Sequence, residues 1–139
     1  MKRIALFALF VANALNCTAD ALTLSSTDEP ARDAALQWLQ LIDAGRFEEA
    51  ASQGAQELFS FEQWINRCKA QRAALGRMNR RQFAEAKRTS MVSGIPDVRR
   101  YYLVRFTTSF ERKPAGIEQV AIAKIGCCWE VFGYTISDK

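Results

Sequence analysis

The chain of 139 residues contains no histidine. Histidine is the usual general acid or base at neutral pH and the commonest nitrogen ligand of zinc. Its absence excludes Ser-His-Asp and Cys-His catalysis, mixed Cys/His zinc sites and the iron site made of two histidines and one carboxylate. The sequence also lacks a Gly-rich phosphate loop, a G-x-S-x-G motif and a C-x-x-C motif. We therefore predict no catalytic residue, no metal site and no cofactor.

The composition is that of one ordinary globular domain. Hydrophobic residues make up 49% of the chain and charged residues 24%, which is typical of a folded protein and not of a disordered one. A length of 139 residues suffices for a single domain and leaves too little for a second.

The amino terminus has the order of features found in a cleavable signal peptide. Lys2 and Arg3 precede an apolar run over residues 4–15, and small residues at Ala19 and Ala21 suit cleavage after either one. The run is too short to span a bilayer, which takes about 20 residues. We expect residues 1–19 to be a signal peptide and the mature chain to be periplasmic or secreted, with no stable membrane insertion after cleavage. The alternative is a buried or amphipathic first helix.

The first half of the mature chain predicts helices. After a short linker and helix cap over residues 20–30, the spacings Ser26-x-x-Glu29 and Ser60-x-x-Gln63 match capping boxes. Apolar residues then recur at helical spacing in both segments. The two helices are expected to end at Gly45 and Gly76, with a shorter helix over residues 47–51 between them.

The second half of the chain predicts strands. Residues 80–92, 101–110, 117–125 and 128–136 favour β-structure, and turn signals stand at residues 93–97, at residues 113–116 and at Gly126. Successive hairpins of this kind form a four-stranded antiparallel meander. Helices first and strands after indicate an α+β fold, with the N-terminal helices packed on one face of a curved sheet. The domain is expected to cover residues 31–137.

Basic residues concentrate in the middle of the chain. Residues 67–113 hold thirteen basic and three acidic residues, whereas residues 20–66 hold nine acidic and two basic. One interpretation is a surface for polyanions. The favoured interpretation is that basic strands face acidic helices or solvate the open sheet face, because neighbours such as Arg80 and Arg81 point to opposite sides of a strand. We expect no nucleic-acid partner.

Three cysteines remain after signal cleavage, namely Cys68, Cys127 and Cys128. The adjacent pair points to opposite sides if both residues are extended, so a bond between them would be strained. Trp129 and Val131 share one strand face, taken as the helix-facing one, and the same parity turns Cys127 inward. Cys68 lies on the apolar stripe of its helix, which predicts a disulfide from Cys68 to Cys127 (or Cys128). The alternative is three buried thiols that act as small hydrophobic side chains.

The favoured function is a non-enzymatic binding module for a small ligand or a protein, with its site in a pocket between helices and sheet. One alternative is an enzyme of the same fold that uses carboxylates, Glu118 or Glu130, with an arginine or tyrosine. Nothing in the sequence brings two carboxylates together at glycosidase distances. Another alternative is a structural protein that forms oligomers, for example a homodimer through the outer sheet face. The ligand residues are not identifiable from the sequence.

A set of short motifs runs through the mature chain. The motifs are Trp38-Leu39, Asp43-Ala44-Gly45-Arg46-Phe47, Trp64, Arg72, Leu75-Gly76, Arg80, Gly94-Ile95-Pro96, Tyr102-Leu103-Val104-Arg105-Phe106, Phe110, Glu118-Gln119-Val120 and Trp129-Glu130-Val131-x-Gly133-Tyr134-x-Ile136. In their order and spacing they resemble the bacterial domain-of-unknown-function family 4019. The likeness spans about residues 31–137, and the Cys127-Cys128 pair stands where the family usually has a plain turn. The resemblance implies a fold similar to nuclear transport factor 2 and the cystatins, and it carries no assigned activity or catalytic residues.

Overall fold

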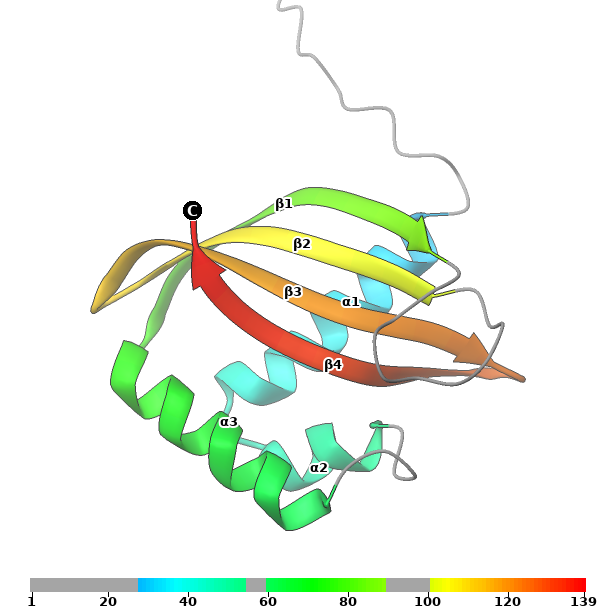
Figure 1. The fold of residues 1–139 in the computed structure, drawn as a ribbon, viewed down its shortest axis with the longest axis horizontal. Coiled ribbons are helices and arrows are strands. Elements are labelled where there is room, and N and C mark those ends of the chain that lie inside the picture. The colour runs from blue at the N-terminus through cyan, green and yellow to red at the C-terminus, as the bar shows by residue number, and fades with distance from the viewer. Residues whose placement is uncertain (1–27, 55–59, 90–100) are drawn as a thin grey trace, which may run out of the picture.

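A computed structural model of the chain describes residues 28–54, 60–89 and 101–139. The predicted signal peptide and the predicted turn at residues 93–97 lie outside the described residues. Three helices precede four strands, which confirms the α+β prediction (Figure 1). The elements are α1 (Glu29–Asp43), α2 (Phe47–Ser52), α3 (Phe61–Leu75), β1 (Met78–Thr89), β2 (Tyr101–Phe110), β3 (Lys113–Ile125) and β4 (Cys128–Asp138).

The strands form one antiparallel sheet in the order β1-β2-β3-β4. The sheet is long and curved, and α1 runs behind it in Figure 1, where it contacts all four strands. Helix α2 contacts both α1 and α3, and α2 and α3 lie below β4 in the same view. None of the helices in the described ranges has the length and apolar character needed to cross a membrane.

The core fills the space between α1 and the inner face of the sheet. Trp38 is 1% exposed and its ring meets that of Tyr134 edge-on, with centroids 5.3 Å apart. The Trp38 indole N–H also donates to the carbonyl oxygen of Ala50 at 2.8 Å, which fastens α2 to α1. The remaining buried members of this core are Ala31, Ala35, Leu39, Ile42, Val104, Phe106, Val120, Ile122 and Val131.

A β-bulge at Phe132 changes which side chains of β4 face the helices. Ala121 pairs with Gly133 and Ile122 pairs with Val131, so Phe132 is an extra residue on β4. Val131 belongs to the helix-facing core, whereas Phe132 packs with Tyr101 on the other side of the sheet. The predicted inward orientation of Val131 is confirmed.

The helix boundaries agree with the sequence, with small differences at the caps. Gly45 and Gly76 follow α1 and α3 with positive φ, as predicted. Asp28 is the N-cap of α1, and Ser60 caps α3 without the side-chain hydrogen bond expected of a capping box.

The turn predicted at residues 113–116 is wrong. Strand β3 already begins at Lys113, which pairs with Phe110, so residues 111–112 alone make the turn. Pro114 is the second residue of the strand. On either side of it, Lys113 pairs with Phe110 and Gly116 pairs with Thr108. Proline lacks a backbone N–H but is tolerated at the first residues of a strand. Pro114 and Gly116 therefore do not mark a turn here.

Candidate functional site

A pocket of about 350 Å³ opens where the helices meet the first strand. It lies at the C-terminal ends of α1 and α3, beside the start of α2 and of β1. Its walls combine apolar side chains with two arginines and one aspartate. The lining residues are Ile42, Asp43, Gly45, Phe47, Arg72, Gly76, Arg77 and Met78.

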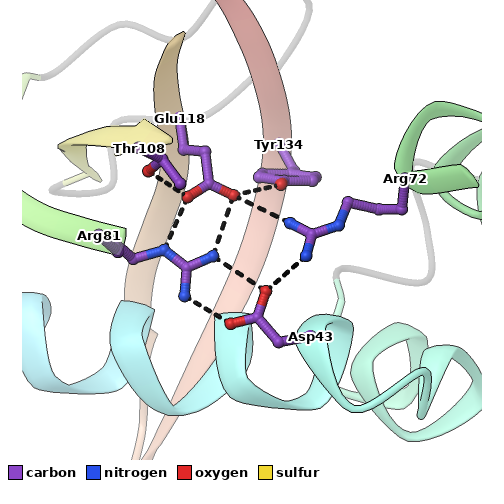
Figure 2. A network of polar contacts seen from close by, with 6 residues as sticks. All are labelled: Asp43, Arg72, Arg81, Thr108, Glu118 and Tyr134. Atoms are coloured by element: carbon purple, nitrogen blue, oxygen red, sulfur yellow. Dashed lines mark hydrogen bonds and ion pairs between the residues drawn. The ribbon is translucent and has the colours of Figure 1, made fainter. Parts of the chain in front are cut away.

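Two of these lining residues also belong to a buried polar network (Figure 2). The network draws one side chain from α1, one from α3 and one from each of the four strands, so it joins both long helices to the whole sheet. Its members are Asp43, Arg72, Arg81, Thr108, Glu118 and Tyr134.

Glu118 on β3 is the centre of the network and is 0% exposed. Its Oε2 atom accepts from Arg81 Nε at 2.6 Å and from the Thr108 hydroxyl at 2.6 Å. Its Oε1 atom accepts from the Tyr134 hydroxyl at 2.6 Å, from Arg81 Nη2 at 3.1 Å and from Arg72 Nη1 at 3.3 Å. A carboxylate offers about four lone-pair positions. The five donor atoms around Glu118 therefore leave none of these lone-pair positions free.

Arg81 on β1 lies between two carboxylates. Besides its two bonds to Glu118, it donates from Nη1 to Asp43 Oδ2 at 2.6 Å and from Nη2 to Asp43 Oδ1 at 3.0 Å. Burial alone lowers the pKa of Arg81, but the hydrogen bonds and charges of Asp43 and Glu118 raise it by more. The net pKa lies above its ordinary value, so Arg81 is a permanent cation of the interior.

Arg72 on α3 closes the ring of charges. Its Nη2 donates to Asp43 Oδ1 at 2.7 Å, and its guanidinium carbon stands 4.8 Å from the ring centroid of Phe110. That distance is within the range of a cation–π contact. The Arg72 side chain is 9% exposed and the Asp43 side chain 20%. The pocket-facing edge of the network is thus the Asp43–Arg72 pair.

Tyr134 on β4 supplies a neutral donor. Burial, and then the negative charge of Glu118, raise the pKa of Tyr134 well above its ordinary value. The hydroxyl therefore stays protonated and continues to donate to Glu118.

The network is balanced in charge and closed to solutes at its centre. Two guanidinium groups face two carboxylates, and every fully buried side-chain polar atom in the described ranges has a hydrogen-bond partner. Glu118 does contact an arginine and a tyrosine, as the carboxylate-enzyme alternative expects. Because it has no exposed surface and no spare lone pair, we assign it a structural role: it ties the helices to the sheet. Glu130 lies on β4 opposite Ala123, away from this network.

Arg77 gives the pocket an exposed positive charge. Its side chain is 81% exposed, and its Nε lies 3.4 Å from Glu111 Oε1. Asp43 is already shared by Arg72 and Arg81. The rim of the pocket can therefore attract an anion, while Ile42, Phe47 and Met78 offer apolar contact.

The predicted disulfide from Cys68 to Cys127 (or Cys128) is not formed in the structure. All three cysteines are free thiols, with Cys68 buried on α3 and the other two exposed at the turn between β3 and β4. The inward orientation expected for Cys127 is wrong, because the turn at Gly126 interrupts the strand alternation that holds from Trp129 to Val131. The alternative of three buried thiols is also wrong, because Cys127 and Cys128 are both exposed. Within the described residues, no cluster of three or more acidic, cysteine or histidine side chains is arranged to hold a metal ion.

Several basic side chains in the described part of the middle segment are paired with acidic residues. Arg81 on the sheet binds Asp43 on α1, which confirms that a basic strand faces an acidic helix. Lys69 on α3 binds Glu48 on α2 at 3.1 Å. Arg105 binds Glu85 across the outer face at 2.7 Å, as expected for a solvated sheet face.

The chain belongs to the family described as a protein of unknown function (DUF4019), whose sequence model matches residues 34–134. Neither a curated protein nor a solved structure matches the chain. The matched range includes all six residues of the buried network.

Proposed function

We propose that the protein is an exported, non-enzymatic module that binds a small organic anion with an apolar body in the pocket at the ends of α1 and α3. The observation that carries this proposal is the pairing of an exposed arginine with apolar walls in one pocket. Binding sites for small molecules are commonly apolar clefts with a few polar groups that fix orientation.

The pocket suits an anion better than a cation. Arg72 and Asp43 line it as members of the charge-balanced network, so Arg77 is the lining cation that lies outside this network. An anionic group at the rim would meet Arg77, whose side chain is 81% exposed although its Nε lies 3.4 Å from Glu111 Oε1. The apolar body of the ligand would lie against Phe47 and Met78.

The floor of the pocket favours binding over catalysis. Asp43 and Arg72 are held by ion pairs of 2.6 to 2.7 Å, and the neighbouring Glu118 is saturated with donors. A rigid floor of this kind lowers the entropy lost on binding. It leaves no carboxylate positioned to transfer a proton to a bound molecule.

Calorimetric titration with phenylacetate and octanoate tests the proposal, with phenylacetamide as an uncharged control probe. We expect a carboxylate to bind and phenylacetamide to bind at least about tenfold more weakly, which corresponds to about 1.4 kcal/mol. Arg77→Ala should weaken carboxylate binding by a similar factor. Arg105→Ala is the matched control, since it removes an exposed arginine paired to a glutamate elsewhere on the sheet. No binding of either carboxylate, or equal losses in the two variants, would overturn the proposal.

Export and the fold relationship are part of the same proposal. The charged, apolar and small-residue segments of residues 1–21 support a signal peptide. Helices laid against one face of a curved meander support a relationship to nuclear transport factor 2 and the cystatins. Native mass spectrometry of protein purified from the periplasm would reveal the cleavage site, the oligomeric state and any retained ligand together. A retained precursor in the cytosol would contradict export.

Self-association through the outer sheet face stays a prediction. The polar side chains of Glu85, Arg105 and Gln119 bind one another across this face. A polar ladder of this kind is typical of a solvated surface.

A further inference from the structure

The turn between β3 and β4 places two thiols side by side at the surface. Ile125 pairs with Cys128, so Gly126 and Cys127 form a two-residue hairpin turn. Gly126 has φ of 60°, a value that favours glycine. Cys127 and Cys128 are both exposed, and their Sγ atoms lie 2.7 Å apart.

The turn accounts for this closeness. Adjacent side chains in an extended strand point to opposite faces. Cys127 occupies the turn and Cys128 begins the strand, so the alternation does not apply to this pair. The two sulfur atoms are in direct contact instead.

We propose that Cys127 and Cys128 form a reversible redox site, which closes to a disulfide between neighbouring residues and reopens on reduction. The oxidant is a small-molecule disulfide. The thiolate of one cysteine attacks this disulfide, forms a mixed disulfide and releases one thiol. The second thiolate then attacks the mixed disulfide at the protein sulfur, which closes the ring and releases the second thiol. Two protein thiols are oxidised and one disulfide is reduced to two thiols, so atoms and electrons balance.

The covalent geometry makes such a bond labile. Neighbouring Cα atoms are about 3.8 Å apart, whereas the Cα atoms of ordinary disulfides are roughly 4.4–6.8 Å apart. Strained and exposed disulfides are the ones that are easily reduced and that serve as switches. Because the turn lies at one end of the sheet, the bond would also leave the helix-facing core unchanged.

Cys68 does not compete for this chemistry in the folded protein. It is 4% exposed, and burial raises the pKa of its thiol to about 11. A buried, protonated thiol is a poor nucleophile.

The test uses the full chain with Cys17→Ser and Cys68→Ala, so that only the adjacent pair remains. Equilibration in glutathione buffers of increasing oxidation should give a monomer whose intact mass is lower by two hydrogen atoms. Excess dithiothreitol should restore the original mass. Phenylarsine oxide, which links two close thiols with release of water, should bind the reduced protein once per chain. Cys127→Ser and Cys128→Ser in the same background should each abolish both results.

Several outcomes would overturn the proposal. Glutathione adducts on both cysteines without an internal bond would do so, as would disulfide-linked dimers. In the chain that keeps Cys68, an internal bond that survives Cys128→Ser would assign the pairing to Cys68 and Cys127 instead. Circular dichroism of each variant serves as a check of folding. If the fold is retained, a negative result counts against the proposed site itself.

Discussion

Glu118→Gln tests whether the buried network ties the helices to the sheet. The substitution keeps the shape of the side chain, removes its charge and replaces one acceptor oxygen with an NH₂ donor. That NH₂ group would face either Arg81 and Thr108, which both donate to Oε2 at 2.6 Å, or Tyr134, which donates to Oε1 at 2.6 Å. Two buried guanidinium groups would then share the single carboxylate of Asp43.

The expected loss follows from the burial of the partners. Glu118 is 0% exposed, and the side chains of Arg72 and Arg81 are 9% and 7% exposed. Removing one partner of a buried ion pair costs about 3–5 kcal/mol, because the remaining charge is left without compensation. With a urea dependence of about 2 kcal/mol per molar, the unfolding midpoint should fall by about 2 M.

Urea unfolding followed by circular dichroism measures this loss. Glu85→Gln is the control, because it neutralises a glutamate of similar strand context whose partner, Arg105, is half exposed. We expect the control to change stability by no more than about 0.5 kcal/mol. A loss below about 1 kcal/mol for Glu118→Gln, with the wild-type fold retained, would refute the assignment of Glu118 as a structural tie.

Three further predictions concern the stability of single-residue variants. Trp38→Phe should cost about 1–3 kcal/mol in urea unfolding, because the carbonyl of Ala50 loses its buried donor; an unchanged midpoint would contradict this. Gly76→Ala should cost about 1–3 kcal/mol, since its φ of 76° and ψ of −160° suit only glycine. Gly126→Ala, with open space around it, should cost less; the reverse order would refute the comparison. Burial raises the pKa of Cys68 from 9.0 to about 11, so stability should fall as pH rises through this interval. Cys68→Ala should reduce that slope when unfolding is measured at several pH values.

The sequence predicts the elements of this fold because each is marked locally. Helical spacing of apolar residues and the glycines at positions 45 and 76 place α1 and α3 almost to the residue. The turn after Phe110 was misplaced because Pro114 and Gly116 resemble a turn, although a strand end tolerates both. Local preferences and strand geometry compete at such a site, and pairing with the neighbouring strand decides it.

The network was not predictable because its members are far apart in the chain. Asp43 and Arg81 lie 38 residues apart, and Arg72 and Glu118 lie 46 apart. Each reads in the sequence as an ordinary surface charge. Two signals exist in the sequence: Asp43, Arg72, Glu118 and Tyr134 stand within the motifs that carry the family resemblance, and Glu118 is a candidate carboxylate with an arginine or tyrosine partner.

Strand alternation alone also fails for Tyr134. Counting from Val131 by twos along β4 places Gly133 on the helix side and turns Tyr134 outward. The extra residue at Phe132 reverses this parity, so Tyr134 reaches Glu118 and Trp38. A bulge has no clear signature in one sequence, and its effect extends to every residue that follows it in the strand.

The pocket and the network share Asp43 and Arg72, so the proposed anion binding would be coupled to the docking of the helices. An anion that approached Arg72 would compete with Asp43 for its donors, while Arg81 would still hold Asp43 through two hydrogen bonds. The second arginine therefore allows Arg72 to exchange partners without leaving Asp43 uncompensated. Asp43 is the last residue of α1, and Phe47 at the start of α2 lines the pocket. Such an exchange of partners would therefore be expected to shift the start of α2. If the proposed function holds, the two arginines that stabilise the network would thus also let the pocket accept a charged ligand.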